Sequence, residues 1–376
     1  MIRRLLHPLF PTPKLARYFA TAFLWRSLGF LIFITVVLQS LDLMAHSDKI
    51  LADERNGFAS LVTYVLLRSP ELISKFGPFC FLLGSIVTLV QLNQHSETII
   101  AKSAGLSRHQ ILAPLVGACL GAGIIMFLFN ELIVMQTSAN LQSWRESDFK
   151  PIPREGFTSA GSKPIWIRDS STNLHIERAY WRAGADRFVF TLKHISLYSG
   201  TEKDGSQYIW RARQARLLPT GWVLDDVNVF NSKSLSTEHH DHRSWPITIA
   251  PRLFSALTTK LETSNFLQLL LIRDVLLEAD YSIVRLQNYL YQKITRPLSM
   301  LLMPLLGCFA GFGLVRSGAL LKRAVFSMGL GFAYFVTENM LFALGKLGTV
   351  PPLIAAFIPF LLFFCIAQTL IHKEQV

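Results

Sequence analysis

Hydrophobic and polar positions divide the chain into two apolar parts separated by a polar one. Apolar runs fill most of the sequence between Phe19 and Leu132 and again between Tyr289 and Ile371. Two of these runs, Ile111–Phe129 and Val350–Ile371, extend over 19 and 22 residues without a charge. Since a helix rises about 1.5 Å per residue, each can cross a hydrocarbon core about 30 Å thick. The pattern predicts membrane-spanning helices on both sides of a polar insert.

Four further apolar runs are shorter and are bordered by single polar residues. They are Ser27–Leu41, Gly77–Gln94, Pro297–Val315 and Ala324–Thr337. Flanking Arg, Lys and Trp side chains can reach the membrane surface from such helices, so these runs also predict spans. We expect six transmembrane helices: helices 1–3 in an N-terminal half, residues 1–133, and helices 4–6 in a C-terminal half, residues 289–376.

The polar insert, residues 134–288, follows a different period. Arg187–Tyr198 and Tyr208–Leu218 alternate between apolar and polar residues, and Pro164–Arg168 and Leu174–Trp181 fit the same period of two. Turn residues such as Pro219–Gly221 separate these segments. Seven or more short strands are expected, as an antiparallel sandwich or jelly roll. The predicted fold class is an α-helical membrane protein with an all-β, β-jellyroll-like domain inserted between helices 3 and 4.

Composition and charge agree with a membrane protein. Charged residues make up 16% of the chain, against about 25% in soluble domains, and mean hydropathy is +0.36. Many of the basic residues behind the net charge of +12 precede span one or lie between spans two and three or four and five: Arg3, Arg4, Lys14, Arg17, Lys102, Arg108, Arg316, Lys322 and Arg323. By the positive-inside rule these segments and both termini are cytoplasmic, while the insert and a short outer loop, Ala45–Glu71, face the other side. Because the basicity reflects topology, no nucleic-acid partner is expected.

The sequence offers no catalytic motif. It has no nucleophile elbow, phosphate-binding glycine loop or HExxH sequence, so an enzyme is not expected. His239–His242 contains three histidines and an aspartate; we expect a solvated loop, and a metal site is the alternative. Cys80, Cys119, Cys308 and Cys365 fall inside predicted spans and are expected to be buried as small apolar residues.

The segment between spans two and three, at about residues 95–108, has the features of a short amphipathic helix. Ser96 can cap its start, Glu97 complements the helix dipole, and Gly105 can end it in a left-handed conformation. The bulky residues on this exposed helix are Thr98, Ile99 and Ile100. Such a helix can dock into the groove of a cytoplasmic partner, or it can simply lie in the membrane interface.

This loop resembles the coupling helix of the LptF/LptG permease family of the lipopolysaccharide exporter. The shared pattern is Ser96-Glu97, then Ser103-x-Gly105-x-Ser107, with a basic residue at Arg108. Similarity extends along nearly the whole chain, at Pro78, Leu82–Gly84, Ile176–Arg178, Lys293–Ile294, Pro297–Leu298 and Pro351–Pro352. Several of these positions, especially Glu177-Arg178, are more similar to LptG than to LptF.

The resemblance implies a permease subunit of an ABC-type transporter in the bacterial inner membrane. Such a subunit extracts lipopolysaccharide from the outer leaflet and passes it through a periplasmic β-jellyroll toward the outer membrane. The implied partners are an LptF-like permease, a dimer of an LptB-like ATPase and an LptC-like bridge protein. ATP is used by the ATPase, so no cofactor is expected in this chain. Ser96, Glu97, Gly105 and Arg108 are the implied coupling residues, with Glu97 meeting a basic residue in the ATPase groove.

The sequence departs from the family at positions that hold the lipid. LptG-type chains tend to have lysines near the outer end of span one, taken to meet the substrate's phosphates. The matching positions here are Gln39, Ala45 and His46. Lys49 or Lys75 can substitute for the missing lysines.

Other charged residues near the predicted lipid cavity have two interpretations each. Arg145 falls on a family arginine and can bind a phosphate bidentately, or it is a surface arginine without a role. Glu338 in span five is a candidate cavity residue because intramembrane carboxylates are costly, or it makes a structural hydrogen bond. Lys293 and Arg296 are expected to snorkel toward the membrane surface.

Two other classes of function are alternatives to an exporter. A non-transporting membrane scaffold that displays a periplasmic β-domain to envelope proteins fits the same topology, but it predicts no ATPase partner. A lipid-modifying membrane enzyme lacks the paired acid and base or the metal cluster that its chemistry requires.

Overall fold

The computed structural model describes residues 13–373 in two compact units. It omits residues 54, 147–148, 150–157, 161–164, 170–171, 184–187, 200–207, 219–220, 245–250, 280 and 312–319. Arg3, Arg4, Pro164, Arg187, Arg316 and the Pro219-Thr220 part of the predicted turn therefore lie outside the described residues. The membrane unit comprises Met1–Gln142, Asn265–Leu270 and Ser282–Val376, and the sheet unit comprises Ser143–Ser264 and Leu271–Tyr281.

Among the described residues, six segments are long and apolar enough to cross a membrane. They are α2 (Pro13–Leu51), α3 (Phe58–Gln94), the continuous run of α5 (Arg108–Phe129), η1 (Asn130–Val134) and α6 (Met135–Glu146), then α9 (Val284–Gly311), α10 (Leu320–Lys346) and α11 (Pro352–Lys373). Shorter helices are α4 (Glu97–Ser103), α7 (Pro251–Thr258), η2 (Leu261–Thr263) and α8 (Phe266–Glu278). Every described strand falls between the third and fourth spans, so the predicted fold class is confirmed.

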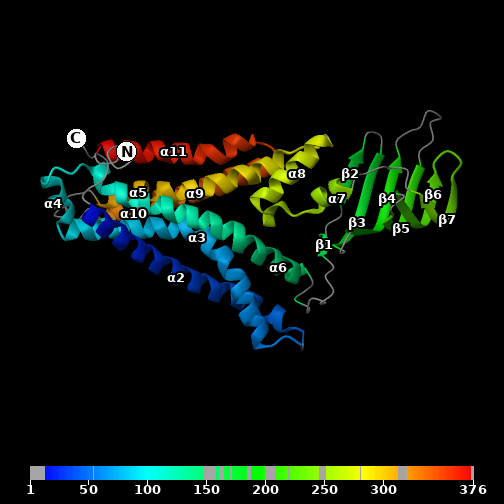
Figure 1. Ribbon diagram of the computed structural model, residues 1–376, viewed down its shortest axis with the longest axis horizontal. Coiled ribbons are helices and arrows are strands. Elements are labelled where there is room, and N and C mark those ends of the chain that lie inside the picture. The colour runs from blue at the N-terminus through cyan, green and yellow to red at the C-terminus, as the bar shows by residue number, and fades with distance from the viewer. Residues whose placement is uncertain are drawn as a thin grey trace. The chain divides into compact units, whose positions relative to one another are not determined.

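The first two spans are longer than their apolar runs. At about 1.5 Å per residue, the 39 residues of α2 extend about 58 Å, well beyond the membrane core. The expected outer loop Ala45–Glu71 is consequently wrong in extent, because only residues 52–57 separate the two helices. Polar contacts between the helices stabilise this extension, as described below. In Figure 1 the two helices diverge from the other spans toward their connection.

Helix α9 forms the centre of the membrane unit. It packs against α3, α5, α10 and α11, and 61% of the residues in its most apolar 18-residue stretch are buried. The corresponding fraction for α2 is 6%, so α2 lies at the periphery with its apolar side chains facing outward. The core joins Phe23, Leu82, Leu115, Leu302 and Tyr334 from five different helices.

The cysteines follow this distribution only in part. Cys80, Cys119 and Cys308 are buried, as expected. Cys365 is exposed on α11, which corrects the prediction for that residue. An outward position on a spanning helix is still apolar because lipid tails, not water, cover it.

The sheet unit contains one seven-stranded antiparallel sheet. Its strands are β1 (Thr158–Ala160), β2 (Ile165–Asp169), β3 (Thr172–Ala183), β4 (Phe188–Ser199), β5 (Tyr208–Leu218), β6 (Gly221–Asn231) and β7 (Ser236–Ser244). The order is β1-β3-β4-β5-β6-β7, and β2 also pairs with β3. The segments predicted from alternation correspond to β2, β3, β4 and β5. The apolar face is continuous from Leu174 on β3 to Val229 on β6.

The period of two breaks at the same level in successive strands. Buried residues of β4 change from even to odd numbers between Leu192 and Ile195, and β5 and β6 change in the same way. The opposed residues at this level, which we call the crossing row, are left out of the strand pairing: Glu177, His194, Arg213, Asp226 and Asp241. His194 and Asp226 have positive φ angles of 51° and 57°. At this level each strand thus contains one residue more than strict alternation requires. Beyond it, the buried positions carry odd instead of even numbers, and the apolar core continues.

The side chains of the crossing row contact one another in pairs, and all but the half-buried Asp226 are exposed. His194 Nδ1 lies 3.3 Å from Glu177 Oε2, and Arg213 Nε lies 3.0 Å from Asp226 Oδ2. Left-handed backbone is uncommon outside glycine, although His and Asp adopt it more often than other residues. The simple alternation expected from the sequence is therefore interrupted by polar residues that tolerate the required conformation.

The histidine-rich segment His239–His242 belongs to strand β7, not to a loop, so that expectation was wrong. His242 Nδ1 lies 2.9 Å from Asp225 Oδ1, and Arg216 Nε donates to Asp225 Oδ2 at 2.7 Å. Burial alone would raise the pKa of Asp225, but the hydrogen bonds from Arg216 and His242 hold it below its usual value. Within the part of the chain that the structure describes, no three His, Cys, Asp or Glu residues group as metal ligands.

A close helix contact between α2 and α3 depends on Gly84. A Cβ atom at this position would lie 2.0 Å from Ser27 Oγ and 2.8 Å from Ser27 Cα. The backbone of α2 therefore occupies the space of a side chain, and the two spans can pack at short range only because residue 84 has none.

We predict that Gly84→Ala destabilises the protein by about 1–3 kcal/mol through overpacking, despite the better helix propensity of alanine. Gly121→Ala on α5 is the matched control, because nothing lies within 4 Å of its Cβ position. Thermal unfolding of the purified proteins in detergent measures both. Equal midpoints for the two variants would contradict the close packing of α2 on α3.

Candidate functional site

A cavity of about 70 Å³ lies inside the membrane unit. Residues of α3, α5, η1, α9 and α10 line it. The polar and charged members are Ser74, Lys75, Asn130, Gln292, Lys293, Arg296, Ser299, Tyr334, Glu338 and Asn339. Apolar side chains such as Met126, Phe127 and Phe335 complete the wall. The cavity therefore combines an apolar surface with a concentration of cationic groups.

Two prolines in the cavity wall add polar backbone to it. Pro78 of α3 and Pro297 of α9 have no N–H to donate to the carbonyl groups of Ser74 and Lys293, four residues earlier. Both carbonyls belong to residues that line the cavity. Both prolines are among the residues that resemble the family, and they belong to two of the helices that form the site.

The cationic side chains that line the cavity differ in burial and in their partners. Lys293 is buried and forms an ion pair with Glu131, so the expectation that it snorkels to the surface is wrong. Arg296, one turn further along α9, is exposed and lines the cavity, as does Lys75 of α3. Glu338 also lines the cavity, and its Oε1 accepts a hydrogen bond of 3.4 Å from Ser299 Oγ. Glu338 can therefore be a cavity residue and make a structural hydrogen bond at the same time.

Glu131 was missed by the sequence analysis although it is central to the polar contacts of this region. It lies in η1, a π-helix of five residues between α5 and α6. Its Oε2 accepts a hydrogen bond of 2.6 Å from the backbone N–H of Phe266, the first residue of α8. The neighbouring Asn130 accepts one of 3.2 Å from Ser74 Oγ. An acidic residue at the end of an apolar span was the available signal.

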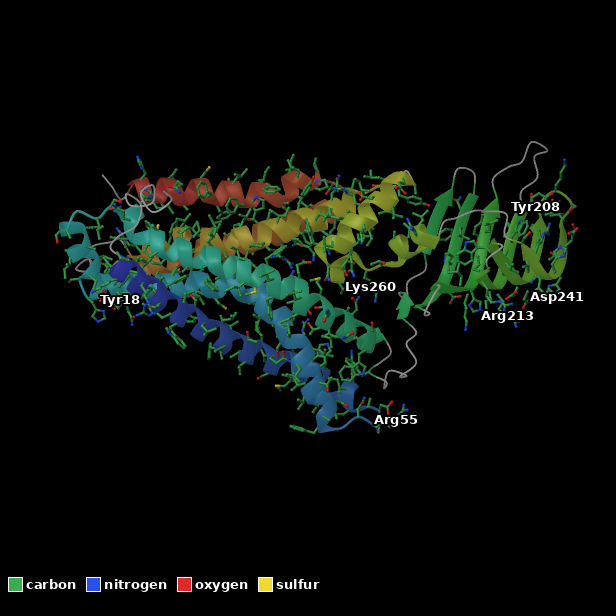
Figure 2. The ribbon with its side chains drawn as sticks, in the orientation of Figure 1. Tyr18, Arg55, Tyr208, Arg213, Asp241 and Lys260 are labelled. Carbon is green, nitrogen blue, oxygen red and sulfur yellow. The ribbon has the colours of Figure 1, made fainter. Side chains whose placement is uncertain are left out.

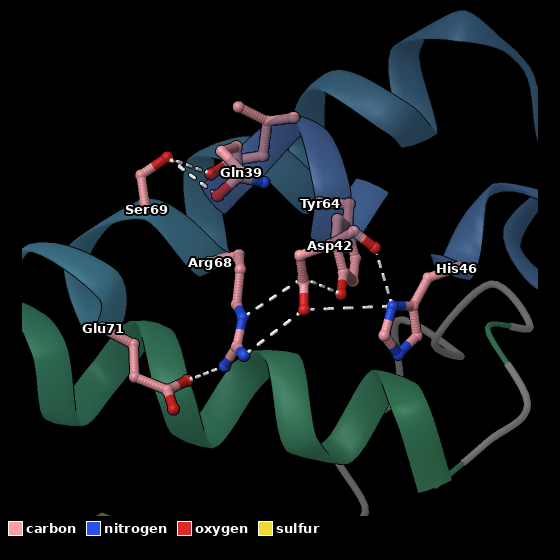
Figure 3. A network of polar contacts seen from close by, with 8 residues as sticks. Gln39, Asp42, His46, Tyr64, Arg68, Ser69 and Glu71 are labelled. Atoms are coloured by element: carbon pink, nitrogen blue, oxygen red, sulfur yellow. Dashed lines mark hydrogen bonds and ion pairs between the residues drawn. The ribbon is translucent and has the colours of Figure 1, made fainter. Parts of the chain in front are cut away.

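A second polar network joins α2 and α3 around Asp42, beside the candidate residues Gln39 and His46 (Figure 3). Its centre is Asp42, whose Oδ2 accepts hydrogen bonds from Tyr64 Oη at 2.6 Å and Arg68 Nε at 3.2 Å. Arg68 also pairs with Glu71. His46 stacks on Tyr64 with a centroid distance of 5.7 Å. The network ties the long extensions of α2 and α3 together.

The predicted lipid-binding residues are thus placed in different surroundings. Gln39 is buried and accepts a hydrogen bond of 3.5 Å from Ser69 Oγ. Gln39, His46 and Lys49 do not line the described cavity, whereas Lys75 does. Arg145 near the end of α6 belongs to the sheet unit and is also absent from the cavity wall.

The predicted coupling segment forms α4 at the end of the membrane unit where α2 begins and α11 ends (Figure 1). Glu97 Oε1 accepts a hydrogen bond of 3.2 Å from Tyr18 Oη of α2, and Figure 2 places Tyr18 at this end. Ile99 and Ile100 are exposed. Thr98 is buried instead and donates to Asn93 Oδ1 at 3.2 Å, so it does not belong to the exposed face.

The sequence predicts the C-terminal end of α4 correctly but not the cap at its N-terminal end. Ser96 precedes the helix, but its side chain makes no capping bond and its backbone is left-handed, with φ of 61°. Its carbonyl instead accepts from the N–H groups of Ile99 and Ile100, so the expected side-chain cap was wrong. Gly105 ends the helix with φ of 89° as predicted.

The C-terminal turn of α4 is a Schellman motif. The Gly105 N–H donates to the Lys102 carbonyl at 2.9 Å, and the Leu106 N–H donates to the Ala101 carbonyl at 3.1 Å. Arg108 is the first residue of the next helix, α5. Ser107 caps that helix through a reciprocal capping box with Gln110. α4 is therefore held between two defined turns, with its isoleucines pointing outward.

A family model and individual known proteins that are similar to this chain all belong to one group of permeases. The family model of the lipopolysaccharide export system permease LptF/LptG matches residues 17–373. The chain is 23% identical over 317 residues to the lipopolysaccharide export system permease protein LptG of Escherichia coli strain K12, covering 83% of this chain and 85% of the relative. It is 24% identical over 326 residues to the protein of the same name in Haemophilus influenzae, covering 84% and 86%.

We predict that Gly105→Ala loosens the end of α4, because a residue with a Cβ atom pays about 1–2 kcal/mol for the left-handed conformation. Space is not the cause, since nothing lies within 4 Å of the Cβ position. Hydrogen exchange of the peptide covering residues 97–106 should become faster. Gly57→Ala is the control, as it is equally unobstructed but has φ of −133°. Unchanged exchange in Gly105→Ala would contradict the Schellman end.

Proposed function

The chain belongs to the LptF/LptG family of lipopolysaccharide export permeases, and we propose that it acts as the G-type half of an exporter driven by an ATPase on a separate chain. The match of the family model to residues 17–373 carries this proposal. It covers both groups of membrane spans and the sheet between them. The chain is a multi-pass protein of the inner membrane, and the two relatives, matched over 83% and 84% of this chain, are LptG proteins.

The proposed orientation places α4 and both termini in the cytoplasm and the sheet unit in the periplasm. Support comes from the positive-inside rule, because α4 and the start of α2 lie at the same end of the membrane unit (Figure 1). Lys14 and Arg17 belong to the start of α2, Lys102 to α4, and Arg108 begins α5, five residues after α4. Six spans return the chain to the side on which it began. The sheet, which follows the third span, then lies on the opposite side from α4.

The proposed contact with the ATPase is the exposed surface of α4. Ile99 and Ile100 are 53% and 64% exposed among the described residues and offer apolar area, and Glu97 adds a negative charge beside them. A small apolar patch with one charge suits a groove that carries a basic residue. ATP binding and hydrolysis on the partner would move α4, and with it the spans on either side.

The proposed cargo site is the cavity at Lys75, Arg296 and Glu338. Its cations suit phosphate groups, and its phenylalanine and methionine side chains suit the adjoining lipid. A volume of about 70 Å³ holds a headgroup fragment or a few waters, not the acyl chains of lipopolysaccharide. An LptF-like chain is therefore needed to enclose the lipid. The sheet and an LptC-like partner would receive it.

We predict that Glu97→Arg weakens association with the ATPase by about tenfold or more, because the reversed charge would face a basic partner residue. Copurification with the ATPase and lipid release from membranes measure the effect. Asp48→Arg, an equal charge reversal at an exposed position near the other end of α2, is the control and should behave as wild type. Full association and release in Glu97→Arg would favour the non-transporting scaffold.

A photo-crosslinking amino acid at Phe335, in the cavity wall, is expected to form an adduct with lipopolysaccharide in the assembled complex. The same probe at Ile125 of α5, which is 69% exposed and absent from the cavity wall, should capture bulk phospholipid instead. Mass spectrometry of the adducts distinguishes the two lipids. Identical phospholipid adducts at both positions would contradict the cavity as a cargo site.

A further inference from the structure

Glu131 occupies an unusual position in an unusual helix. The third span changes from α-helix to π-helix at Asn130–Val134 and back again at Met135. Single π-helical turns are rare, and they are frequently found at functional sites. The turn sends two adjacent side chains in different directions: Asn130 toward Ser74 of α3 and the cavity, and Glu131 toward α8 and α9.

The two oxygens of the Glu131 carboxylate have separate partners. Oε1 forms the ion pair with Lys293 of α9, whose side chain is 9% exposed, while that of Glu131 is 14% exposed. Oε2 accepts the Phe266 N–H at 2.6 Å. A carboxylate at the first turn of a helix satisfies an orphan N–H group and complements the helix dipole. One side chain therefore joins three elements.

The start of α8 is one of two points where the chain passes from the sheet unit to the membrane unit, and the other is at Ser282. Asn265–Leu270 belongs to the membrane unit, whereas Ser264 before it and Leu271 after it belong to the sheet unit. Asn265 N–H donates to Gln268 Oε1 at 3.0 Å, and this local bond does not reach the spans. The hydrogen bond from Phe266 to Glu131 does.

Lys293 also lines the cavity. An anionic group that enters the cavity competes with Glu131 for the Lys293 ammonium group, because both are oxygen anions seeking the same cation. Loss of Lys293 leaves a buried carboxylate without its main counter-ion, which is unfavourable in an apolar surrounding. The carboxylate then lies beside a second anion, and repulsion between the two shifts it from its place, which weakens its hydrogen bond to Phe266.

We propose that Glu131 is a positioning residue that couples occupancy of the cavity by a lipid phosphate to the attachment of α8. This proposal rests on the proposed function, since it takes an anionic lipid as the cargo. With the cavity empty, the carboxylate holds the α8 start against α9 and η1. With a phosphate on Lys293, the α8 start is released, and the chain leading to the sheet unit gains freedom when cargo is present.

The test is hydrogen exchange of the peptide covering residues 265–270. The full chain is prepared with its permease and ATPase partners in phosphatidylcholine nanodiscs. In wild type, lipopolysaccharide should speed exchange of this peptide by about tenfold, because an amide exchanges when its hydrogen bond opens. Glu131→Gln should exchange fast without lipid and should not respond further. Asp53→Asn, which removes another paired carboxylate of the membrane unit that does not line the cavity, should respond as wild type.

A double variant, Glu131→Lys with Lys293→Glu, exchanges the two charges and keeps the test decisive if Glu131→Gln does not fold. It keeps an ion pair but cannot accept the Phe266 N–H, so it should fold and exchange fast. Inorganic phosphate at the same concentration should leave wild type unchanged, because it is not held at the membrane. An equal response to phosphate would overturn the assignment to a lipid headgroup.

Failure of the coupling and failure of the proposed function give different results. If lipopolysaccharide crosslinks in the cavity but exchange of residues 265–270 is the same in wild type and Glu131→Gln, the coupling is overturned. If lipopolysaccharide does not bind the complex at all, the proposed function is overturned, and the coupling falls with it.

Discussion

The ion pair between Glu131 and Lys293 is the interaction on which the polar interior of the membrane unit depends. A lone ammonium group inside an apolar bundle is unfavourable, so Lys293 requires a nearby carboxylate. The π-helical turn brings Glu131 to it, and the same turn directs Asn130 to Ser74. Arg296 and Lys75 line the same cavity as Lys293, so an anionic ligand that reaches Lys293 meets three cationic side chains.

The same requirement for internal partners explains the extension of α2 and α3. Charged side chains at Asp42, Arg68 and Glu71 would interrupt two isolated helices at the edge of a membrane. Joined through Asp42, they form a network that lets both helices continue well beyond their apolar runs. The two helices therefore share an acid–base network near their connection.

The sheet obeys a different constraint, the parity of its strands. A strand can bury one face only if alternate residues are apolar, and a single extra residue reverses which face is buried. In the crossing row the extra residues occur at one level in neighbouring strands, so the reversals match and the core stays continuous. His194 and Asp226 accept the positive φ angles that this requires. The polar row is then a consequence of keeping the apolar face intact.

The sequence by itself determined the number of spans, the place of the β-domain, the left-handed end of α4 at Gly105 and the family, because these depend on runs, periods and motifs within short windows. It did not reveal Glu131, the Asp42 network, the helical extent of residues 45–71 or the strand that contains His239–His242. Those depend on pairs such as Glu131 and Lys293, which are 162 positions apart. Local hydropathy cannot show whether a charge at the end of a span faces the membrane surface or a partner on another helix. Only the packing of α5, α8 and α9 around one carboxylate decided that.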